Sequence, residues 1–314
     1  MSRLRQAVEI DGRQLVLSNL DKPLWPREGY TKADLISYLL AVSAYLLPHL
    51  RQRPLVLTRY PNGIGRASFY QKNVPANAPA WIPTWEDRSG SGRSIRYLLV
   101  EERAALAWLG NLAAIELHPW YSRAVRPEEP DVAVMDLDPA EGADFDDVRE
   151  VAGLLGRLLE DLGLQFWLKT SGATGLHVYV PIRSGHSYAQ VVAFTRRLAE
   201  LIVEVHPRKA TVARPVVERR GKVYLDYLQN GRGKTLACVY GPRPQPGAPV
   251  STPIRWEELG HVHPRQFNLQ TVPPRLEKLG DIFLPVLAGR QDLAQAAGEL
   301  GIKLADYGKL DFRR

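Results

Sequence analysis

The stretch VAVMDLD, residues 132–138, places two acids on a predicted buried strand. Side chains alternate between the two faces of a strand, so Asp136 and Asp138 share one face. Two carboxylates at positions i and i+2 repel each other, and a bound cation is their ordinary remedy. Oxygen ligands of this kind suit Mg²⁺ or Mn²⁺. Alone, the pattern more often marks an exposed strand end whose carboxylates face water.

A third acid lies in a second apolar strand, KVYLDYL, residues 222–228. Asp226 is expected to share its face with Tyr224 and Leu228, and a lone acid in such a strand is costly unless it is paired or metal-bound. Three strand-borne carboxylates in a basic protein favour phosphoryl transfer assisted by two metal ions. The alternative is a structural salt bridge from Asp226 to a nearby basic residue: Arg219, Arg220 or Lys222.

A glycine-containing turn precedes a third strand in KTSGATGLHVYVPI, residues 169–182. Ser171, Gly172 and Gly175 predict a turn whose backbone N–H groups can approach an anion closely. His177 opens the following strand on the same face as Tyr179 and could donate a hydrogen bond to a phosphate oxygen. A plain glycine turn between two elements of secondary structure is the competing interpretation.

The remaining pattern alternates helices and strands. The segment 8–17 predicts a hairpin with a type I′ turn at Asp11-Gly12. Capping residues predict three helix starts: Thr31 with Asp34, Asp144, and Ser187 with Gln190. The expected helices cover 32–47, 101–114, 145–163, 187–205 and about 291–300, and the expected strands include 132–138, 176–182 and 222–228. The five prolines of 241–253 exclude a helix or a central strand there. This order predicts an α+β fold with mixed layers.

Composition is that of a basic globular protein. The chain has 314 residues, 45% hydrophobic and 24% charged residues, and a net charge of +7. A positive charge of this size suggests an anionic partner, with nucleic acid first. One cysteine, Cys238, excludes an internal disulfide framework. No apolar run is long enough to span a membrane and the N-terminus does not resemble a secretion signal, so we expect no membrane partner and a cytoplasmic location.

Three ordered motifs carry a resemblance to a known family. MDLDP (135–139), TSGATGLH (170–177) and YLDYLQNGRGKT (224–235) resemble the three motifs of archaeo-eukaryotic primases. The chain is more closely similar to the polymerase domain of bacterial ligase D, the end-joining polymerase that works with Ku. The similarity extends over nearly the whole chain through SNLDKPLWP (18–26), GYTKADLISYL (29–39), LTRYPNG (57–63), FYQKN (69–73), IELHPW (115–120) and RPQPGAPVSTP (243–253).

The resemblance implies a primase-like fold: mixed β-sheets with an RRM-like catalytic half and helices packed on the outer faces. It implies one primase-polymerase domain over 1–314. Within it we expect an N-terminal sub-region over 1–125 that contacts DNA, a catalytic core over 126–260 and a C-terminal extension over 261–314. The sequence contains no ligase motif and no phosphoesterase segment. It therefore fits a stand-alone member or an excised domain.

The resemblance also assigns site residues. The metal-binding and catalytic acids correspond to Asp136, Asp138 and Asp226. The residues expected to bind the nucleotide correspond to His118, Ser171, Gly172, Gly175, His177, Arg219, Gln229 and Arg243. A pocket for the 5′-phosphate of a broken DNA end corresponds to Asn19, Lys22 and Lys32. An aromatic platform that stacks on the template corresponds to Phe69 and Tyr70.

Residue chemistry agrees with part of this assignment. Lys32 lies at the predicted start of a helix, where N–H groups favour an anion, although a solvated lysine is the common alternative. Phe69 and Tyr70 precede Lys72 and so combine aromatic faces with a cation, as single-strand binding requires. Either ring could instead belong to the core, and so could His118.

The glycine motif departs from the family at one position. Many relatives carry a lysine where this chain has Thr174. The substitution removes one positive charge near the expected triphosphate, and Lys169 or Lys234 could replace it. It bears on the strength of nucleotide binding rather than on the type of reaction.

The sequence therefore predicts template-directed nucleotidyl transfer with two Mn²⁺ or Mg²⁺ ions. The substrate is a nucleoside triphosphate, and the expected partners are DNA ends, gapped duplex, Ku and a separate ligase. Two alternatives stay open: a primase that starts chains without a primer, and a non-catalytic module that binds DNA ends.

Overall fold

The computed structural model describes residues 5–88, 94–289 and 291–308, which form two compact units. Among these residues, unit 1 comprises 5–88, 94–120, 236–252 and 265–281, and unit 2 comprises 121–235, 253–264, 282–289 and 291–308. The chain passes from unit 1 to unit 2 after residue 120 and returns twice to unit 1, at 236–252 and at 265–281.

Unit 2 is built on a six-stranded sheet in the order β13-β14-β10-β12-β11-β15. Its strands are β10 (Val132–Pro139), β11 (Trp167–Thr170), β12 (Leu176–Pro181), β13 (Ala210–Thr211), β14 (Val223–Asp226) and β15 (Pro253–Ile254). Only the pair of β13 and β14 is parallel among these strands. The described chain thus has the predicted α+β architecture with a mixed sheet.

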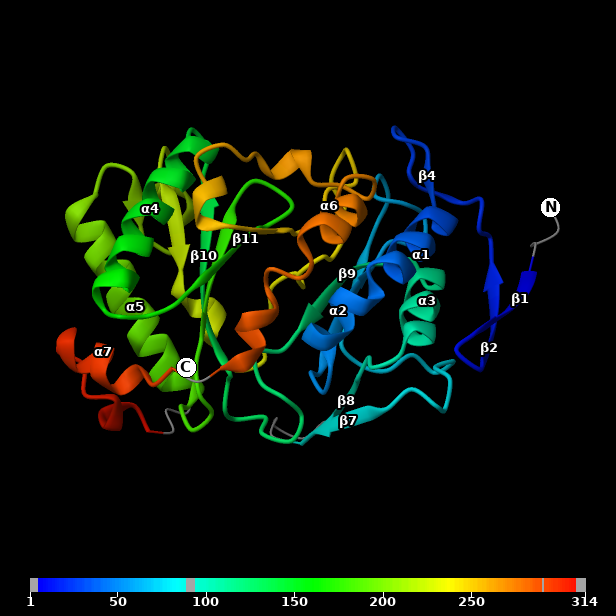
Figure 1. Ribbon diagram of the computed structural model, residues 1–314, viewed down its shortest axis with the longest axis horizontal. Helices are drawn as coiled ribbons and strands as arrows, with labels where there is room; N and C mark the ends of the chain where they lie inside the picture. The colour runs from blue at the N-terminus through cyan, green and yellow to red at the C-terminus, as the bar shows by residue number, and fades with distance from the viewer. Residues whose placement is uncertain (1–4, 89–93, 290, 309–314) are drawn as a thin grey trace. The chain divides into compact units, whose positions relative to one another are not determined.

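Two long helices pack together along this sheet: α4 (Phe145–Asp161) and α5 (Tyr188–Val205) (Figure 1). Both start at the predicted residues. Asp144 accepts hydrogen bonds from the N–H groups of Asp146 and Asp147, and Ser187 forms the predicted capping box with Gln190. The apolar stripe of each helix is buried, and both helices contact β10.

Unit 1 contains a five-stranded sheet in which β5 lies between β9 on one side and β6 and β8 on the other. Its strands are β5 (Leu55–Arg59), β6 (Phe69–Gln71), β7 (Thr84–Asp87), β8 (Ile95–Leu98) and β9 (Ala114–Pro119). Helices α1 (Lys32–Ala41), α2 (Ser43–Leu50) and α3 (Arg103–Asn111) pack against one another, and α3 also contacts β9 (Figure 1). Helix α6 (Val272–Leu279) belongs to a returning segment.

The smaller elements complete the chain. The predicted hairpin is confirmed as β1 (Arg5–Ile10) and β2 (Arg13–Ser18), and both Asp11 and Gly12 have positive φ, as a type I′ turn requires. The other short elements are β3 (Pro23–Trp25), β4 (Tyr30–Thr31), α7 (Leu293–Glu299) and the 3₁₀ turns η1 (Val216–Arg219), η2 (Tyr227–Asn230), η3 (Trp256–Glu258), η4 (Pro264–Gln266), η5 (Leu284–Ala288) and η6 (Leu304–Tyr307).

Three predicted elements are corrected. The helix expected over 32–47 breaks at Val42 into α1 and α2, which are bent by 79°. The helix expected over 101–114 ends at Asn111, because Ala114 already belongs to β9. The strand expected over 222–228 ends at Asp226, whose side chain accepts a hydrogen bond from Leu228 N–H and so caps η2. Leu228 is therefore not a strand neighbour of Asp226.

No single helix in the described parts of the chain is long and apolar enough to cross a membrane. The bent pair α1 and α2 meets the criterion of length and composition only when its two halves are joined.

The side chain of Asn230 pairs with the backbone of β10 at Val134, where β14 no longer runs alongside it. Asn230 lies just past β14, and its side chain is 1% exposed. Its Oδ1 accepts from Val134 N–H at 2.8 Å, and its Nδ2 donates to the Val134 carbonyl at 2.7 Å. These bonds extend the ladder of β10 beyond the point where β14 ends.

We predict that Asn230→Ala destabilises unit 2 by about 2–4 kcal/mol, because two buried backbone groups of Val134 lose their partners. Urea unfolding followed by circular dichroism measures the change. Thr195→Val is the matched control, since it removes only the hydroxyl that contacts Asn230 Nδ2 at 3.1 Å and should cost about 1 kcal/mol. A loss for Asn230→Ala no larger than that of the control would contradict the prediction.

Candidate active site

The register of the sheet in unit 2 gathers the predicted acids. Asp136 lies directly opposite Asp226 across β10 and β14, and Asp138 lies opposite Tyr224. Residues directly opposite each other in an antiparallel pair share a face, with Cβ atoms about 4.5–5.5 Å apart. All three carboxylates therefore project from one face at one end of the sheet.

The three acids have different surroundings. Asp136 is 4% exposed, so the alternative of a strand end facing water does not hold for it, whereas Asp138 is exposed. Asp226 accepts hydrogen bonds from Leu228 N–H at 3.1 Å and from Gln229 Nε2 at 3.2 Å. A buried carboxylate opposite a second carboxylate is the arrangement that a cation would relieve.

The glycine loop closes against the end of β10. Ser171 Oγ accepts hydrogen bonds from the N–H groups of Ala173 at 3.1 Å and Gly175 at 3.0 Å. The loop thus uses two of its own amides internally, which the sequence analysis did not anticipate. A Cβ atom at Gly175 would lie 2.3 Å from the Leu137 carbonyl oxygen and 2.8 Å from Asp138 Oδ1. Only glycine lets the loop come this close to the acid.

Two buried polar side chains, His177 and Lys169, lie in a row behind Asp136. His177 pairs with Asp136 in the register of β10 and β12, and its Nε2 lies 3.3 Å from Asp136 Oδ1. Its Nδ1 lies 2.7 Å from Nζ of the fully buried Lys169. The imidazole thus lies between the Lys169 amine and the Asp136 carboxylate. His177 is 2% exposed, and its ring faces Asp136.

Two other predicted residues of unit 2 lie beside the acids. The Arg219 guanidinium stacks over the ring of Tyr224 at 3.5 Å, and its Nε donates to the Ala213 carbonyl at 2.8 Å. Gln229 contacts Asp226, as described above. The structure thus brings both residues to the acid-bearing strand end, Arg219 through the ring that lies opposite Asp138.

His118 and Arg243 meet in unit 1 through a residue that the sequence analysis missed. Arg243 Nε lies 3.0 Å from Glu116 Oε1, and His118 Nε2 lies 3.8 Å from Glu116 Oε2. Burial would raise the pKa of Glu116, but the nearby His118 and the charge of Arg243 outweigh it and lower the pKa to about 2. Glu116 and His118 are two residues apart on β9, and this spacing in IELHPW was the available signal.

The predicted 5′-phosphate residues are also brought together in unit 1. Lys22 N–H donates to the Asn19 carbonyl at 3.1 Å, and Lys32 N–H donates to the Lys22 carbonyl at 2.9 Å. The amides of Lys32 and Asp34 are thus used within the protein, the second by its bond to Thr31 Oγ1. An anion here would depend on the lysine side chains rather than on the helix amides that we expected to bind it.

The two lysines of this set differ in burial. Lys32 is 5% exposed, and its Nζ donates to the Ser18 carbonyl at 2.7 Å. Burial, followed by the charges of Lys22 and Arg59, lowers the pKa of Lys32 to about 8. Lys22 is less buried and donates to Asn62 Oδ1 at 2.8 Å.

Phe69 and Tyr70 lie exposed on β6 rather than in the core, with 44% and 55% of their surface accessible. Arg59 lies 4.9 Å from the centre of the Phe69 ring, and Lys72 lies 5.9 Å from that of Tyr70. Exposed rings backed by cations suit stacking against the bases of single-stranded nucleic acid.

The acid-bearing strand end has the oxygen donors for a metal ion, but their side chains are not assembled around one point. In the described ranges, no group of three or more His, Cys, Asp or Glu side chains stands so that it could hold a metal ion. The carboxylates of Asp136, Asp138 and Asp226 are nevertheless the hard oxygen donors that Mg²⁺ and Mn²⁺ accept, and their backbone positions converge. The Asp226 side chain is turned toward Gln229, as repulsion between like charges favours.

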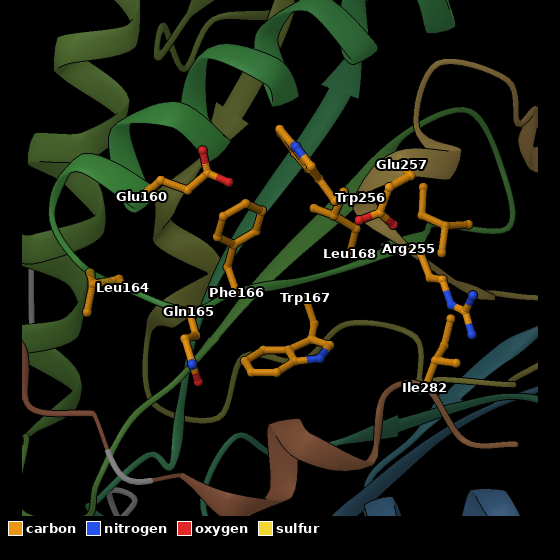
Figure 2. A pocket seen from close by; sticks show the side chains of 11 residues that line it. Glu160, Leu164, Gln165, Phe166, Trp167, Leu168, Arg255, Trp256, Glu257 and Ile282 are labelled. Carbon is orange, nitrogen blue, oxygen red and sulfur yellow. The ribbon is translucent and has the colours of Figure 1, made fainter. Parts of the chain in front are cut away.

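A separate pocket of about 560 Å³ opens in unit 2 between the end of α4, β11 and η3. Figure 2 shows Phe166, Trp167 and Trp256 lining it, together with the charged side chains of Glu160 and Arg255. Phe166 and Trp256 meet edge to face at 5.2 Å. None of the predicted site residues lines this pocket, so it is distinct from the acid-bearing strand end.

Comparison with solved structures defines the class. The chain is similar to a structure described as the polymerase domain from Mycobacterium tuberculosis ligase D in complex with DNA, with a TM-score of 0.82 and 28% identity over 88% of this chain and 99% of that one. The fold is therefore that of a primase-like polymerase domain. The family model for the LigD primase-polymerase domain matches residues 31–283, and the chain belongs to that family.

Curated relatives agree with this family. The chain is 34% identical over 281 residues to the bifunctional non-homologous end joining protein LigD of Bacillus subtilis, covering 89% of this chain and 45% of that protein. It is 32% identical over 272 residues to the multifunctional LigD of Mycolicibacterium smegmatis, covering 86% of this chain and 36% of that protein. The chain thus spans less than half the length of these relatives.

Proposed function

We propose that this chain catalyses template-directed nucleotidyl transfer at gaps in broken DNA during non-homologous end joining. A primer 3′-hydroxyl attacks the α-phosphate of a nucleoside triphosphate, the new phosphodiester bond forms, and pyrophosphate leaves. The observation that carries the proposal is the convergence of Asp136, Asp138 and Asp226 on one face beside the Gly175 loop. Family membership and the positive net charge support it.

Each of the three acids has its own role in this proposal. Asp136 and Asp138 would hold two Mn²⁺ or Mg²⁺ ions, and Asp226 would join them as a ligand by giving up its contact with Gln229. When bound, such ions lower the pKa of an attacking hydroxyl and neutralise a triphosphate. Lys169 and His177 hold the Asp136 carboxylate in orientation, which keeps the strand end pre-organised.

DNA would be bound by unit 1. Phe69 and Tyr70 offer the stacking platform, and Asn19, Lys22 and Lys32 offer a 5′-phosphate site. The similar M. tuberculosis structure is described in complex with DNA, which supports this role. Ku and a DNA ligase activity are what end joining would require in addition.

The test is extension of a gapped duplex that carries a 5′-phosphate on its downstream strand, compared with a bare single-stranded template. Extension of the gapped duplex with little product on the bare template is expected. Products on the bare template would indicate a primase instead. Tight DNA binding without turnover on either substrate would indicate a non-catalytic end-binding module.

We predict that recognition of the 5′-phosphate weakens as pH rises through about 8. Lys32 binds an anion only while its ammonium is protonated, and its lowered pKa of about 8 places the loss in that range. The ratio of affinities for phosphorylated and unphosphorylated gapped duplex, measured by fluorescence anisotropy from pH 6.5 to 9.5, should fall about tenfold.

Lys32→Met supplies the control for this titration. The variant should give a low ratio at every pH, because the titrating group is gone. A wild-type ratio that stays constant across the range, or a variant ratio that still falls, would remove Lys32 from the 5′-phosphate site.

A further inference from the structure

The pocket at the end of α4 is built entirely within unit 2. Its lining residues come from the end of α4, the start of β11, the segment from β15 into η3, and Ile282. Its volume of about 560 Å³ falls in the range of sites that hold drug-sized ligands. Leu164, Leu168 and Ile254 give it a buried apolar lining. The site therefore has room for a few residues of a polypeptide.

Three aromatic rings line this pocket, and each is only partly buried: Phe166, Trp167 and Trp256. Phe166 and Trp256 meet at an interplanar angle of 88°, with 5.2 Å between their ring centroids, so they form an aromatic corner rather than a closed stack. A Cβ atom at Gly156 would lie 2.2 Å from Cη2 of Trp256. Glycine weakens the interior of a helix, and here it leaves the room that the indole occupies against α4.

The charged groups of the pocket favour a cation at one side. Among the described lining residues, Glu160 and Glu257 carry negative charge and Arg255 carries positive charge, and all three are exposed. Glu160 lies in the last turn of α4, where the carbonyl end of a helix also favours a cation. In Figure 2, Glu160 and Arg255 lie on opposite sides of the aromatic corner. A cation near Glu160 is thus attracted by the carboxylate and by the ring faces, away from Arg255.

These charges distinguish the pocket from the aromatic platform of unit 1. There, the exposed rings are backed by Arg59 and Lys72, which attract phosphate. Here the rings have carboxylates as neighbours, and a carboxylate repels the phosphates of a nucleic-acid strand. A side chain with an apolar stem and a cationic end satisfies the rings, the carboxylates and the apolar lining together. Arginine has this composition, and its planar guanidinium stacks on aromatic faces.

We propose that this pocket docks an arginine-bearing segment of a partner protein, with the guanidinium over the aromatic corner and paired with Glu160. The exposed rim lets an extended chain run across the site, where Arg255 can donate to its carbonyl oxygens. The inference goes beyond nucleotidyl transfer, because the pocket is lined by none of the residues proposed for catalysis or DNA binding.

Two short peptides test the site: acetyl-Gly-Arg-Leu-Gly-amide, and the same peptide with citrulline in place of arginine. Citrulline keeps the planar end of the side chain and removes its charge. We expect the arginine peptide to bind about tenfold more tightly in titrations followed by tryptophan fluorescence and saturation-transfer NMR. Equal affinities for the two peptides, or no saturable binding of the arginine peptide up to about 10 mM, would overturn the inference.

Glu160→Gln locates the binding, because the amide keeps the size of this exposed side chain and removes its charge. The variant should bind the arginine peptide about five- to tenfold more weakly and the citrulline peptide as wild type does. Asp161→Asn is the matched control: it removes the same charge from the next residue of the same helix end, outside the pocket, and its Kd should stay within about twofold of wild type. Equal losses in both variants would show only a long-range effect of charge and contradict the pairing with Glu160.

A short single-stranded oligothymidylate decides between a peptide and a nucleic acid as the occupant. The oligonucleotide and the arginine peptide should bind independently, and displacement of the peptide would assign the pocket to nucleic acid and overturn the inference. Gap extension by Glu160→Gln should equal that of wild type. A wild type that extends no primer contradicts the proposed function, while the Kd of the arginine peptide still decides the docking site.

Discussion

Replacing Asp136 or Asp138 by asparagine is expected to reduce primer extension on a gapped duplex roughly a thousandfold, about 4 kcal/mol of lost transition-state stabilisation. Asparagine keeps the shape of each side chain and removes the charge that would hold a divalent cation. Single-turnover extension with a labelled primer and Mn²⁺ measures the effect. Extension by either variant within about tenfold of wild type would exclude that acid from the metal site.

The asparagine variants should stay folded, so unfolding would not explain their loss of activity. Asp136 lies opposite Asp226, so removing one charge relieves repulsion, and asparagine keeps the size of the side chain beside His177. The melting temperature of Asp136→Asn without metal should therefore be at least that of wild type. Asp161→Asn, at the exposed end of α4, is the charge-matched control and should retain full activity.

Metal binding can be followed without turnover. A ligand that binds only the folded state raises the melting temperature in proportion to the logarithm of its concentration. Mn²⁺ at millimolar concentration should therefore stabilise the wild type, and the double variant Asp136→Asn with Asp138→Asn should lose this response. Equal stabilisation of both proteins would place the metal elsewhere.

Local chemistry made part of this structure predictable from sequence. The caps at Thr31, Asp144 and Ser187 start their helices where the sequence indicated, because each cap is a contact within four residues. Alternation along β10 placed Asp136 and Asp138 on one face, and the observed register with β14 added Asp226 to that face.

Features set by distant segments were not predictable. The apolar pattern continues through Val42, so the bend between α1 and α2 leaves no local signal. Asn230 and Glu116 act on residues brought close only by the fold: Asn230 on Val134, and Glu116 on Arg243. Periodicity reports which face a residue occupies, but not which remote chain segment will cover that face.

Replacing Gly175 by alanine is expected to damage stability and activity together. The added Cβ would meet the Leu137 carbonyl oxygen at 2.3 Å, and this oxygen belongs to a central strand that cannot yield. The loop must then move away from β10, which strains the bonds of Gly175 with the Ser171 backbone and hydroxyl. Crowding of this kind costs about 1–3 kcal/mol, and each bond lost adds about 1 kcal/mol.

Activity should fall further than this loss of stability requires, because the same Cβ would lie 2.8 Å from Asp138 Oδ1 and displace a carboxylate of the proposed metal site. Misplacement by about 1 Å is enough to cost roughly a hundredfold in rate. Urea unfolding and gap extension at a temperature where the variant is folded separate the two effects. Gly153→Ala on α4, whose Cβ would meet only Arg157 Nη1 at 3.7 Å, should gain about 0.5–1 kcal/mol and keep full activity. If Gly175→Ala instead matched this control, the close approach of the loop to Asp138 would have no part in catalysis.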